Sequence, residues 1–319
     1  MPGEFALIDR IRARVQPRAD VALGIGDDGA VLDVPPGHQL VVACDTLVAG
    51  VHFPADTAAA DIGWKALAVN LSDLAAMAAT PAWCTLALTL PDADADWVDA
   101  FLDGFLALAD EHGVTLVGGD TTSGPLSITV TAHGLVPRGR ALRRDGARDG
   151  DEVWITGSLG DAAGALQQWR ARGPASAKLR YRLDRPRPRV QAGLALRGLA
   201  SAGVDISDGL AADLGHVLAA SGVGARIDLG RLPTSRTLAE HFDEAVRWPL
   251  QLAGGDDYEL CFTAPPAAAF AIEQALAACD TTATVIGQLE SATGLRLVTP
   301  EGDEYALPTA GFQHFQGLH

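Results

Sequence analysis

Apolar and polar positions alternate along the first half of the chain in a way that predicts strands and helices in turn. Short apolar runs bounded by turn residues are typical of strands, and longer runs with helical spacing indicate helices. The predicted strands are 39–44, 85–90, 115–117 and 127–135, and the predicted helices are 59–79 and 97–112. This order favours an α/β fold.

A polar stretch rich in arginine and glycine, between Pro137 and Asp151, interrupts this pattern and indicates a connection between domains. After it the pattern starts again, with a strand at 152–156, a glycine turn at 157–160 and a helix that ends at Arg170. We therefore expect two domains of mixed α and β structure. They are residues 1–140 and residues 150–319.

The segment from Arg180 to Arg189 contains Pro186 and Pro188 among several arginines. Proline removes a backbone donor and does not fit the interior of a helix or a central strand. We expect this segment to be a surface loop.

The composition is that of a globular protein, with 48% hydrophobic and 20% charged residues in a chain of 319. The N-terminus lacks the pattern of a signal peptide, and no apolar run is long enough to span a membrane. The sequence favours a cytoplasmic protein without membrane contact. The four cysteines are scattered, which favours separate reduced thiols; they are Cys44, Cys84, Cys261 and Cys279.

The net charge of −16 argues against binding to nucleic acid, since affinity for the phosphate backbone depends on clustered lysine and arginine. The two lysines, Lys65 and Lys178, follow Trp64 and Ala177, so the chain has no phosphate-binding loop of the Gly-Lys-Ser/Thr type. A nucleotide could still bind through cations held by the acidic residues.

Six short motifs place an Asp beside Gly, Ser, Thr or another polar residue, often where an apolar run ends. They are 26–29, 44–46, 70–73, 118–122, 205–209 and 254–259. Asp45 and Asp120 directly follow strand-like runs, where open α/β sheets present ligands. Asp beside Gly is also common in ordinary turns, and Ser207-Asp208 could be no more than an N-cap. So many acidic motifs with few basic neighbours favour a metal site.

Asp73 supports the same interpretation. Ile62, Ala66, Val69 and Asp73 fall on one face of the predicted helix, and that face should point inward. A buried carboxylate is costly unless it is paired or coordinates a metal. Lys65 is expected to lie off this face, which leaves a metal as the better partner.

The kind of metal follows from the kind of ligand. Carboxylates, hydroxyls and backbone carbonyls, without clusters of histidine or thiolate, suit Mg²⁺, Mn²⁺ or Ca²⁺. Mg²⁺ commonly joins a few carboxylates to substrate phosphates. The sequence therefore predicts hard cations that link an acidic pocket to a polyphosphate.

These motifs resemble the thiamine-monophosphate kinase family, which belongs with aminoimidazole ribonucleotide synthetase and selenophosphate synthetase in one superfamily. The matching segments follow one another through nearly the whole chain: 3–5, 24–28, 45–53, 65–73, 118–122, 205–210, 254–260 and 311–315. The segments 45–53 and 256–260 are particular to the thiamine-phosphate branch.

The resemblance implies an aminoimidazole ribonucleotide synthetase-like fold of class α/β (α+β), with an N-terminal mixed sheet and a C-terminal α/β sandwich. It also implies a homodimer that pairs through the N-terminal sheets, with the nucleotide near that interface. The implied reaction is direct in-line transfer of the γ-phosphoryl group of ATP to thiamine monophosphate, without a phospho-enzyme. The N-terminal domain would bind ATP and magnesium, and the C-terminal domain would complete the substrate site.

The resemblance also implies the role of each matching residue. The ligands of several Mg²⁺ ions would be Asp28, Asp45, Asp73, Asp120, Asp205 and Asp208. The contacts to ATP would be Gly119, Asp120, Arg144 and Ser207, and the contacts to thiamine monophosphate would be His52, Asp256 and Phe312.

The chain departs from the family pattern at a few positions. Ala43 and Cys44 stand where the family often has Ser-Thr, so a hydroxyl ligand is lost, although Cys44 could offer its backbone carbonyl to a metal. Asp256 replaces a glutamate and reaches one methylene less far. Two alternatives remain open: an ATP-dependent ligase like aminoimidazole ribonucleotide synthetase, and a non-catalytic nucleotide or Ca²⁺ module, whose regular calcium-loop spacing is missing here.

Overall fold

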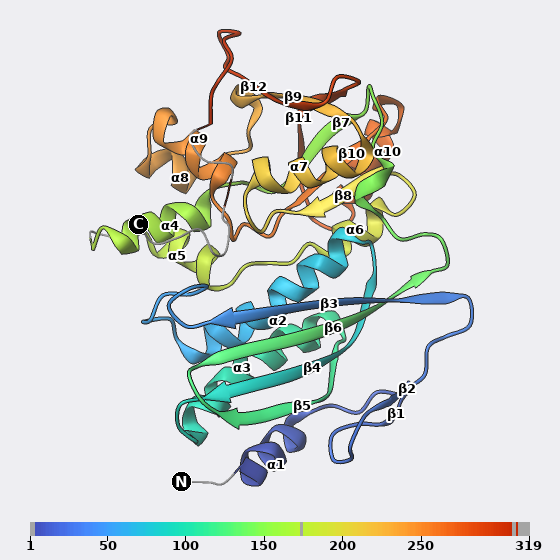
Figure 1. The fold of residues 1–319 in the computed structure, drawn as a ribbon, viewed down its shortest axis with the longest axis vertical. Helices are drawn as coiled ribbons and strands as arrows, with labels where there is room; N and C mark the ends of the chain where they lie inside the picture. The colour runs from blue at the N-terminus through green and yellow to red at the C-terminus, as the bar shows by residue number, and fades with distance from the viewer. Residues whose placement is uncertain (1–3, 173–174, 308–310, 312–319) are drawn as a thin grey trace. The chain divides into compact units, whose positions relative to one another are not determined.

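The computed structural model describes residues 4–172, 175–307 and 311, and it consists of two units, each with its own sheet (Figure 1). The first unit comprises the described residues up to Leu74 together with Ala79–Gly139. The second comprises Ala75–Ala78 and the described residues from Arg140 onward. Within the described ranges, no helix combines the length and the apolar character needed to cross a membrane.

The first unit contains a mixed sheet of four strands in the order β3-β6-β4-β5. β4 and β5 are parallel, while β6 is antiparallel to both of its neighbours, so β3 and β5 form the two edges. The strands of this sheet are β3 (His38–Val48), β4 (Thr80–Leu90), β5 (Thr115–Ser123) and β6 (Ser127–Pro137). Outside it, β1 (Val21–Leu23) pairs with β2 (Val31–Leu32). The helices are α1 (Glu4–Arg14), α2 (Ala59–Ala76) and α3 (Ala95–His112).

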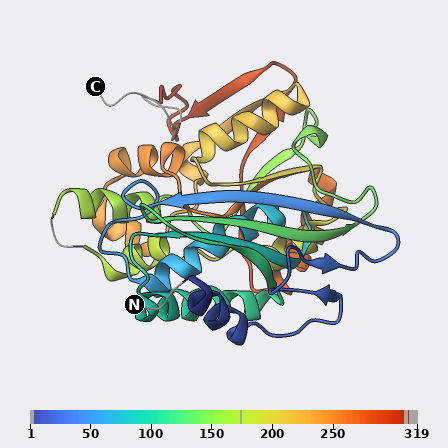
Figure 2. The same cartoon turned by 60° about the horizontal axis from the view of Figure 1, so that its bottom comes forward.

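Helices α2 and α3 cover one face of this sheet, behind it in Figure 1. They approach each other closely, since a Cβ atom on Gly104 would lie 1.7 Å from the carbonyl oxygen of Ala60. Helix α1 lies beside α3 (Figure 2) and is tied to it by ion pairs from Arg10 to Asp99 and from Arg14 to Asp103.

The other face of the sheet carries apolar side chains that this unit leaves open. On β3, Val41 and Leu47 point toward the helices and are 8% and 4% exposed. Leu40 and Val42, which alternate with them, are 44% and 55% exposed. Successive strand residues point to opposite faces, so β3 offers apolar side chains to both faces.

The second unit is built on a sheet of six strands in the order β12-β9-β11-β7-β10-β8, of which only the β12–β9 pair is parallel. The strands are β7 (Glu152–Thr156), β8 (Ala202–Asp205), β9 (Gly224–Asp228), β10 (Leu260–Ala264), β11 (Ala283–Glu290) and β12 (Gly294–Val298). The helices are α4 (Asp161–Arg170), α5 (Ala177–Asp184), α6 (Val190–Leu196), α7 (Leu210–Ser221), α8 (Arg236–His241), α9 (Glu244–Ala253) and α10 (Ala269–Ala277), with short 3₁₀ turns η1 (Arg144–Gly146), η2 (Leu229–Arg231) and η3 (Pro266–Ala268).

Every strand and helix that the apolar pattern predicts is present, and strand 152–156 has the predicted bounds. The prediction of a loop at Arg180–Arg189 is wrong for its first half, because α5 continues to Asp184. The Ser176 hydroxyl caps the start of this helix, and the helix ends before Pro186. The arginines are tolerated because acidic side chains pair with them, as Asp184 does with Arg180.

Candidate functional site

Two of the acidic motifs lie side by side in the second unit. Asp205 ends β8 and pairs with Leu260 of β10. Beyond the strands the pairing continues in the loops: the N–H of Tyr258 donates to the carbonyl of Ile206 at 2.8 Å, and the N–H of Asp256 donates to that of Ser207 at 2.9 Å. The structure therefore brings the 205–209 loop and the 254–259 segment together.

The 205–209 loop is held from the other side by a carboxylate on α7. Oδ2 of Asp213 accepts hydrogen bonds from the N–H groups of Ser207, Asp208 and Gly209, at 3.0, 3.0 and 3.1 Å. Helix α7 begins after Gly209 and has no side-chain cap, so the alternative that Ser207-Asp208 is only an N-cap is wrong. Burial, followed by the nearby charge of Asp205, raises the pKa of Asp213 to about 7.

The 254–259 segment leaves little room next to this loop. A Cβ atom on Gly255 would lie 2.3 Å from the carbonyl oxygen of Ser207, so no larger residue fits there unless the loop moves. Asp256 and Tyr258 both have positive φ, at +70° and +50°, which is uncommon for residues other than glycine. The hydroxyl of Tyr258 donates to Oδ1 of Asp256 at 3.0 Å and so holds the carboxylate in place.

Two fully enclosed acids follow Asp256 in sequence. Glu259 is 0% exposed and receives hydrogen bonds from Thr156 at 2.7 Å, from Arg182 at 2.8 Å and from Arg189 at 2.5 and 2.6 Å. These bonds join the arginine-rich segment to the motif. Oδ2 of Asp257 accepts from the N–H of Gly160 at 2.8 Å, while its Oδ1 has no hydrogen-bond partner among the described residues. Burial raises the pKa of Asp257 well above its usual value.

In the first unit, Asp45 and Asp120 lie within strands and not after them, so the expected strand-end position is wrong. Pairing with β6 continues β3 to Val48, and pairing with β4 continues β5 to Ser123. The hydrogen-bonded ladder thus carries both strands beyond their apolar runs. Asp45 is half-buried, and its N–H donates to Oδ1 of Asn70 on α2 at 3.0 Å.

The register of the sheet separates these two aspartates. Asp45 pairs with Val130 of β6, and its side chain lies on the face of the sheet that the helices cover. Asp120 is exposed on the open face. Its successive cross-strand partners are Ala87, Thr129 and Thr46. The two residues also stand on the two edge strands, roughly 14 Å apart at about 4.8 Å per strand. One copy of the sheet does not bring Asp45 and Asp120 into a common site.

Cys44 precedes Asp45 and therefore points its side chain to the open face. Its sulfur accepts a hydrogen bond from the hydroxyl of Thr131 at 3.4 Å. The N–H of Asp45 points away from β6, toward Asn70. Backbone groups of successive strand residues point in opposite directions, so those of Cys44 point toward β6 and its carbonyl belongs to the strand ladder. All four cysteines are free thiols.

His52 lies in the turn after β3. Its Nδ1 accepts from the N–H of Val48 at 2.9 Å, so the neutral ring carries its proton on Nε2. Its carbonyl accepts from Nζ of Lys65 at 3.0 Å.

Helix α2 carries Lys65 and Asp73. The inward face of α2 is confirmed, with Ile62, Ala66 and Val69 all at most 3% exposed, and Asp73 is half-buried. Helical spacing places Lys65 off this face, but that position is also enclosed. Lys65 is 1% exposed, because α2 is enclosed on nearly all sides.

The remaining predicted residues are exposed or lie outside the described part of the chain. Asp28 follows β1 in an exposed loop, and Gly119 is exposed within β5. Arg144 begins η1 with an exposed side chain, and its carbonyl accepts from the Ser221 hydroxyl at 2.7 Å. Phe312 lies outside the described residues, but Gly311 is described, and a Cβ atom there would lie 2.8 Å from the carbonyl oxygen of Asp208.

The predicted metal ligands are carboxylate and backbone carbonyl oxygens, and these suit a hard cation such as Mg²⁺. Among the described residues, no group of three or more His, Cys, Asp or Glu side chains is arranged to hold a metal ion. Mg²⁺ is usually bound through one or two carboxylates completed by waters and substrate phosphates, and it needs no such group. The Asp205–Asp208 loop can offer two carboxylates of this kind.

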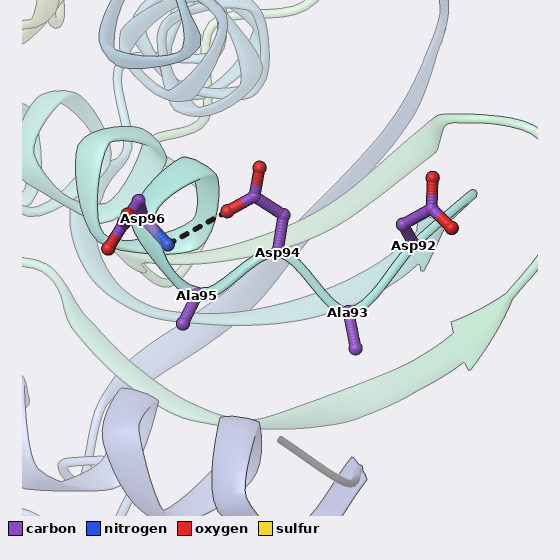
Figure 3. Close-up of a pocket in the computed structure, with 5 residues that line it drawn as sticks. All are labelled: Asp92, Ala93, Asp94, Ala95 and Asp96. Carbon is purple, nitrogen blue, oxygen red and sulfur yellow. Dashed lines mark hydrogen bonds between the residues drawn. The ribbon is translucent and has the colours of Figure 1, made fainter. Parts of the chain in front are cut away.

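A separate open depression of about 360 Å³ lies where β4 leads into α3 (Figure 3). Its lining residues are Asp92, Ala93, Asp94, Ala95 and Asp96. Asp94 caps α3 by accepting from the N–H groups of Asp96 and Trp97 at 3.0 and 3.1 Å. The depression contains no residue of the predicted site, and its acidic rim would repel a phosphate.

The sequence motifs assign no role to Asp213, Asp257 or Glu259. The signal that singled out Asp73 was also available for Asp213, which lies among Leu210, Leu214 and Val217 on the apolar face of α7 and is 3% exposed. A carboxylate at such a position needs a partner. For Glu259 the signal was the excess of arginine at 180–189.

The chain matches two family models: AIR synthase related protein, N-terminal domain, over residues 26–136, and AIR synthase related protein, C-terminal domain, over residues 148–299. It is 48% identical to the thiamine-monophosphate kinase of Salmonella typhimurium over 98% of each chain. A crystal structure of thiamine-monophosphate kinase from Stenotrophomonas maltophilia has a TM-score of 0.87 and 55% identity over 92% of this chain and 96% of that one.

A solved structure of AaThiL complexed with AMPPCP and TMP has a TM-score of 0.77 and 31% identity, covering 98% of this chain and 97% of that one. The matches extend through both units, and the range of the C-terminal family model contains residues 205–209 and 254–259. The chain therefore belongs to the AIR synthase related proteins and, among them, to the thiamine-monophosphate kinase family.

Proposed function

We propose that this protein transfers the γ-phosphoryl group of ATP to thiamine monophosphate and forms thiamine diphosphate and ADP, the last step in making that cofactor. The observation that carries the proposal is the identity of 48% to a thiamine-monophosphate kinase across 98% of both chains. The relative complexed with AMPPCP and TMP supports a site for both substrates. The protein would act in the cytoplasm, where its four free thiols would stay reduced.

The carboxylates that the family resemblance names would hold the magnesium ions. In the first unit these are Asp28, Asp45, Asp73 and Asp120, and in the second they are Asp205 and Asp208. The backbone carbonyl of Cys44 would be a further donor through the lone pair that the strand ladder does not use. When bound, Mg²⁺ supplies charge neutralisation on the phosphate oxygens and fixes their orientation. The N-terminal domain, within residues 1–140, would carry Gly119, Asp120 and most of the magnesium ligands, and the C-terminal domain, within 150–319, would complete the substrate site.

The protein's own residues would position the two phosphates. Arg144 offers a planar fork to phosphate oxygens, and Gly119, Asp120 and Ser207 would contact ATP. His52, Asp256 and Phe312 would face thiamine monophosphate. A phosphate oxygen of the acceptor attacks the γ-phosphorus, and the bond to the β–γ bridging oxygen breaks, so ADP leaves without a covalent enzyme intermediate. Phosphoryl transfer of this kind needs positioning more than a nucleophilic side chain.

We also propose a homodimer that pairs through the open face of the four-stranded sheet. Leu40 and Val42 are exposed on that face, and a second copy would cover them. The separation of Asp45 from Asp120 within one copy supports the same dimer. In a symmetric dimer, Asp45 of one copy can lie near Asp120 of the other. Sedimentation analysis of Val42→Asp against the wild type tests the dimer: the variant should sediment as a monomer.

A product assay tests the proposed reaction. Purified protein is given ATP, Mg²⁺ and thiamine monophosphate, and thiamine diphosphate is separated and quantified. We expect stoichiometric thiamine diphosphate and ADP, loss of turnover with EDTA, and an Mg²⁺ activation curve steeper than that of a single site. Phosphate release that needs a formylglycinamidine substrate would instead indicate an aminoimidazole ribonucleotide synthetase-like ligase. Tight nucleotide binding with no product would indicate a non-catalytic module.

A further inference from the structure

The contact between Asp213 and the 205–209 loop reverses the usual way in which a helix start is capped. In most helices a Ser or Asp before the first turn accepts hydrogen bonds from the helix N–H groups. Here the helix supplies the acceptor: one oxygen of Asp213, in the first turns of α7, receives three successive N–H groups of the preceding loop. Ser207 and Asp208 consequently do not serve as the cap of α7.

Hydrogen bonds to its backbone hold the loop from both sides. The N–H groups of Ser207, Asp208 and Gly209 donate to Asp213, while the carbonyls of Ile206 and Ser207 accept from the 254–259 segment. Asp213 is 3% exposed, so water does not compete for its oxygen. With its peptide groups held in this way, the loop can present its side chains in one arrangement at little entropic cost on binding.

We propose that Asp213 is a positioning residue, which holds the loop so that Asp205, Ser207 and Asp208 are pre-arranged for a magnesium–nucleotide complex. This inference rests on the proposed function for the identity of the ligand. Asp213 acts through the loop and does not need to touch the nucleotide. Residues that orient metal ligands in this indirect way commonly change affinity or activity about 10- to 100-fold when they are replaced.

The experiment compares Asp213→Ala, Asp213→Asn and the control Leu218→Ala with the wild type. Leu218 is buried at the far end of the same helix, so its truncation destabilises α7 without touching the loop. Three quantities are measured: amide hydrogen exchange at residues 206–210 without ligand, calorimetric binding of a β,γ-methylene ATP analogue with Mg²⁺, and KM for each substrate.

For Asp213→Ala we expect fast exchange confined to 206–210, analogue binding weaker by about tenfold or more, and a raised KM for ATP. The KM for thiamine monophosphate should change less than about threefold, because the 254–259 segment keeps its other bonds. Asp213→Asn keeps an acceptor oxygen and should fall between the wild type and the alanine variant. Leu218→Ala should lower the Tm and leave analogue binding unchanged.

Wild-type binding and exchange in Asp213→Ala would overturn the inference, and so would an equal loss of binding in Leu218→Ala. If Asp213→Ala does not fold, Asp213→Asn decides the question, since wild-type analogue affinity in that variant would count against a positioning role. Exchange and analogue binding do not require turnover. A wild-type protein that makes no thiamine diphosphate would therefore contradict the proposed function and still leave Asp213 open to this test.

Discussion

The N–H of Asp256 donates a 2.9 Å hydrogen bond to the carbonyl oxygen of Ser207, and this bond joins the proposed substrate-binding segment to the proposed nucleotide-binding loop. A change that separates these two backbones should therefore disturb both substrates at once.

Gly255→Ala should have this effect, because its new methyl group would lie 2.3 Å from the Ser207 oxygen. We expect kcat/KM to fall about 100-fold, as displacements near 1 Å can cost that much. The matched control is Gly215→Ala in α7, where a Cβ atom would meet nothing within 4 Å. That variant should keep its activity and gain about 0.5–1 kcal/mol in stability. Equal kinetics in the two variants, measured by steady-state assay, would contradict the prediction.

Glu259→Gln should destabilise the second unit strongly. The buried carboxylate neutralises Arg182 and Arg189, and removing one partner of a buried ion pair typically costs about 3–5 kcal/mol. Urea unfolding monitored by tryptophan fluorescence measures the loss. Glu290→Gln is the control, since its pair with Arg296 lies at the surface and should contribute little. Similar midpoints for the two variants would mean that the Glu259 network is not stabilising.

Asp257 should make the protein more stable as the pH falls. Its pKa is raised in the folded state, so the folded protein binds a proton that the unfolded chain releases above a pKa of about 3.9. Stability from this group is complete below that value and is lost as the pH rises through the folded pKa, by at most about 1.4 kcal/mol per pH unit.

Thermal unfolding of Asp257→Asn and the wild type between pH 5 and 8 measures this contribution. The wild type should gain stability relative to the variant on acidification, because the amide does not titrate. A constant difference between the two Tm values across this range would show that Asp257 keeps its charge on folding.

Asp45→Asn should lower kcat by about 100-fold or more while the fold persists. Loss of a carboxylate ligand removes several kcal/mol of metal-supported stabilisation, at 1.36 kcal/mol for each tenfold change. The hydrogen bond from its N–H to Asn70 is a backbone contact and survives the change. Asp92→Asn, in the exposed loop of Figure 3, is the control and should behave as the wild type. Near-normal turnover in Asp45→Asn would remove this residue from the metal site.

The apolar pattern was sufficient to predict the strands and helices that it singled out between residues 39 and 170, because burial of one face dominates their formation. It did not predict that polar residues such as Asp45 and Asp120 lie inside strands, since ladder pairing with a distant strand extends them. The resemblance named the site residues, and the structure places Ser207 next to Asp256 through backbone bonds that no sequence spacing reveals.

Residues that support the site were harder to find in the sequence. Glu259 and Arg189 are 70 residues apart in the chain, and only the fold shows that one neutralises the other. Lysine is seldom enclosed, and the helical spacing that places Lys65 off the apolar face of its helix gave no sign of its burial. The carbonyl of His52, which accepts from its ammonium group, makes burial tolerable.

The enclosure of Lys65 gives the protein a natural reporter of its own unfolding. The chain has two lysines, and the other, Lys178, is exposed in the second unit. An amine-acylating reagent should modify Lys178 at once and reach Lys65 only when the first unit opens. Mass spectrometry of the two acylated peptides would then follow the opening of that unit without any introduced label.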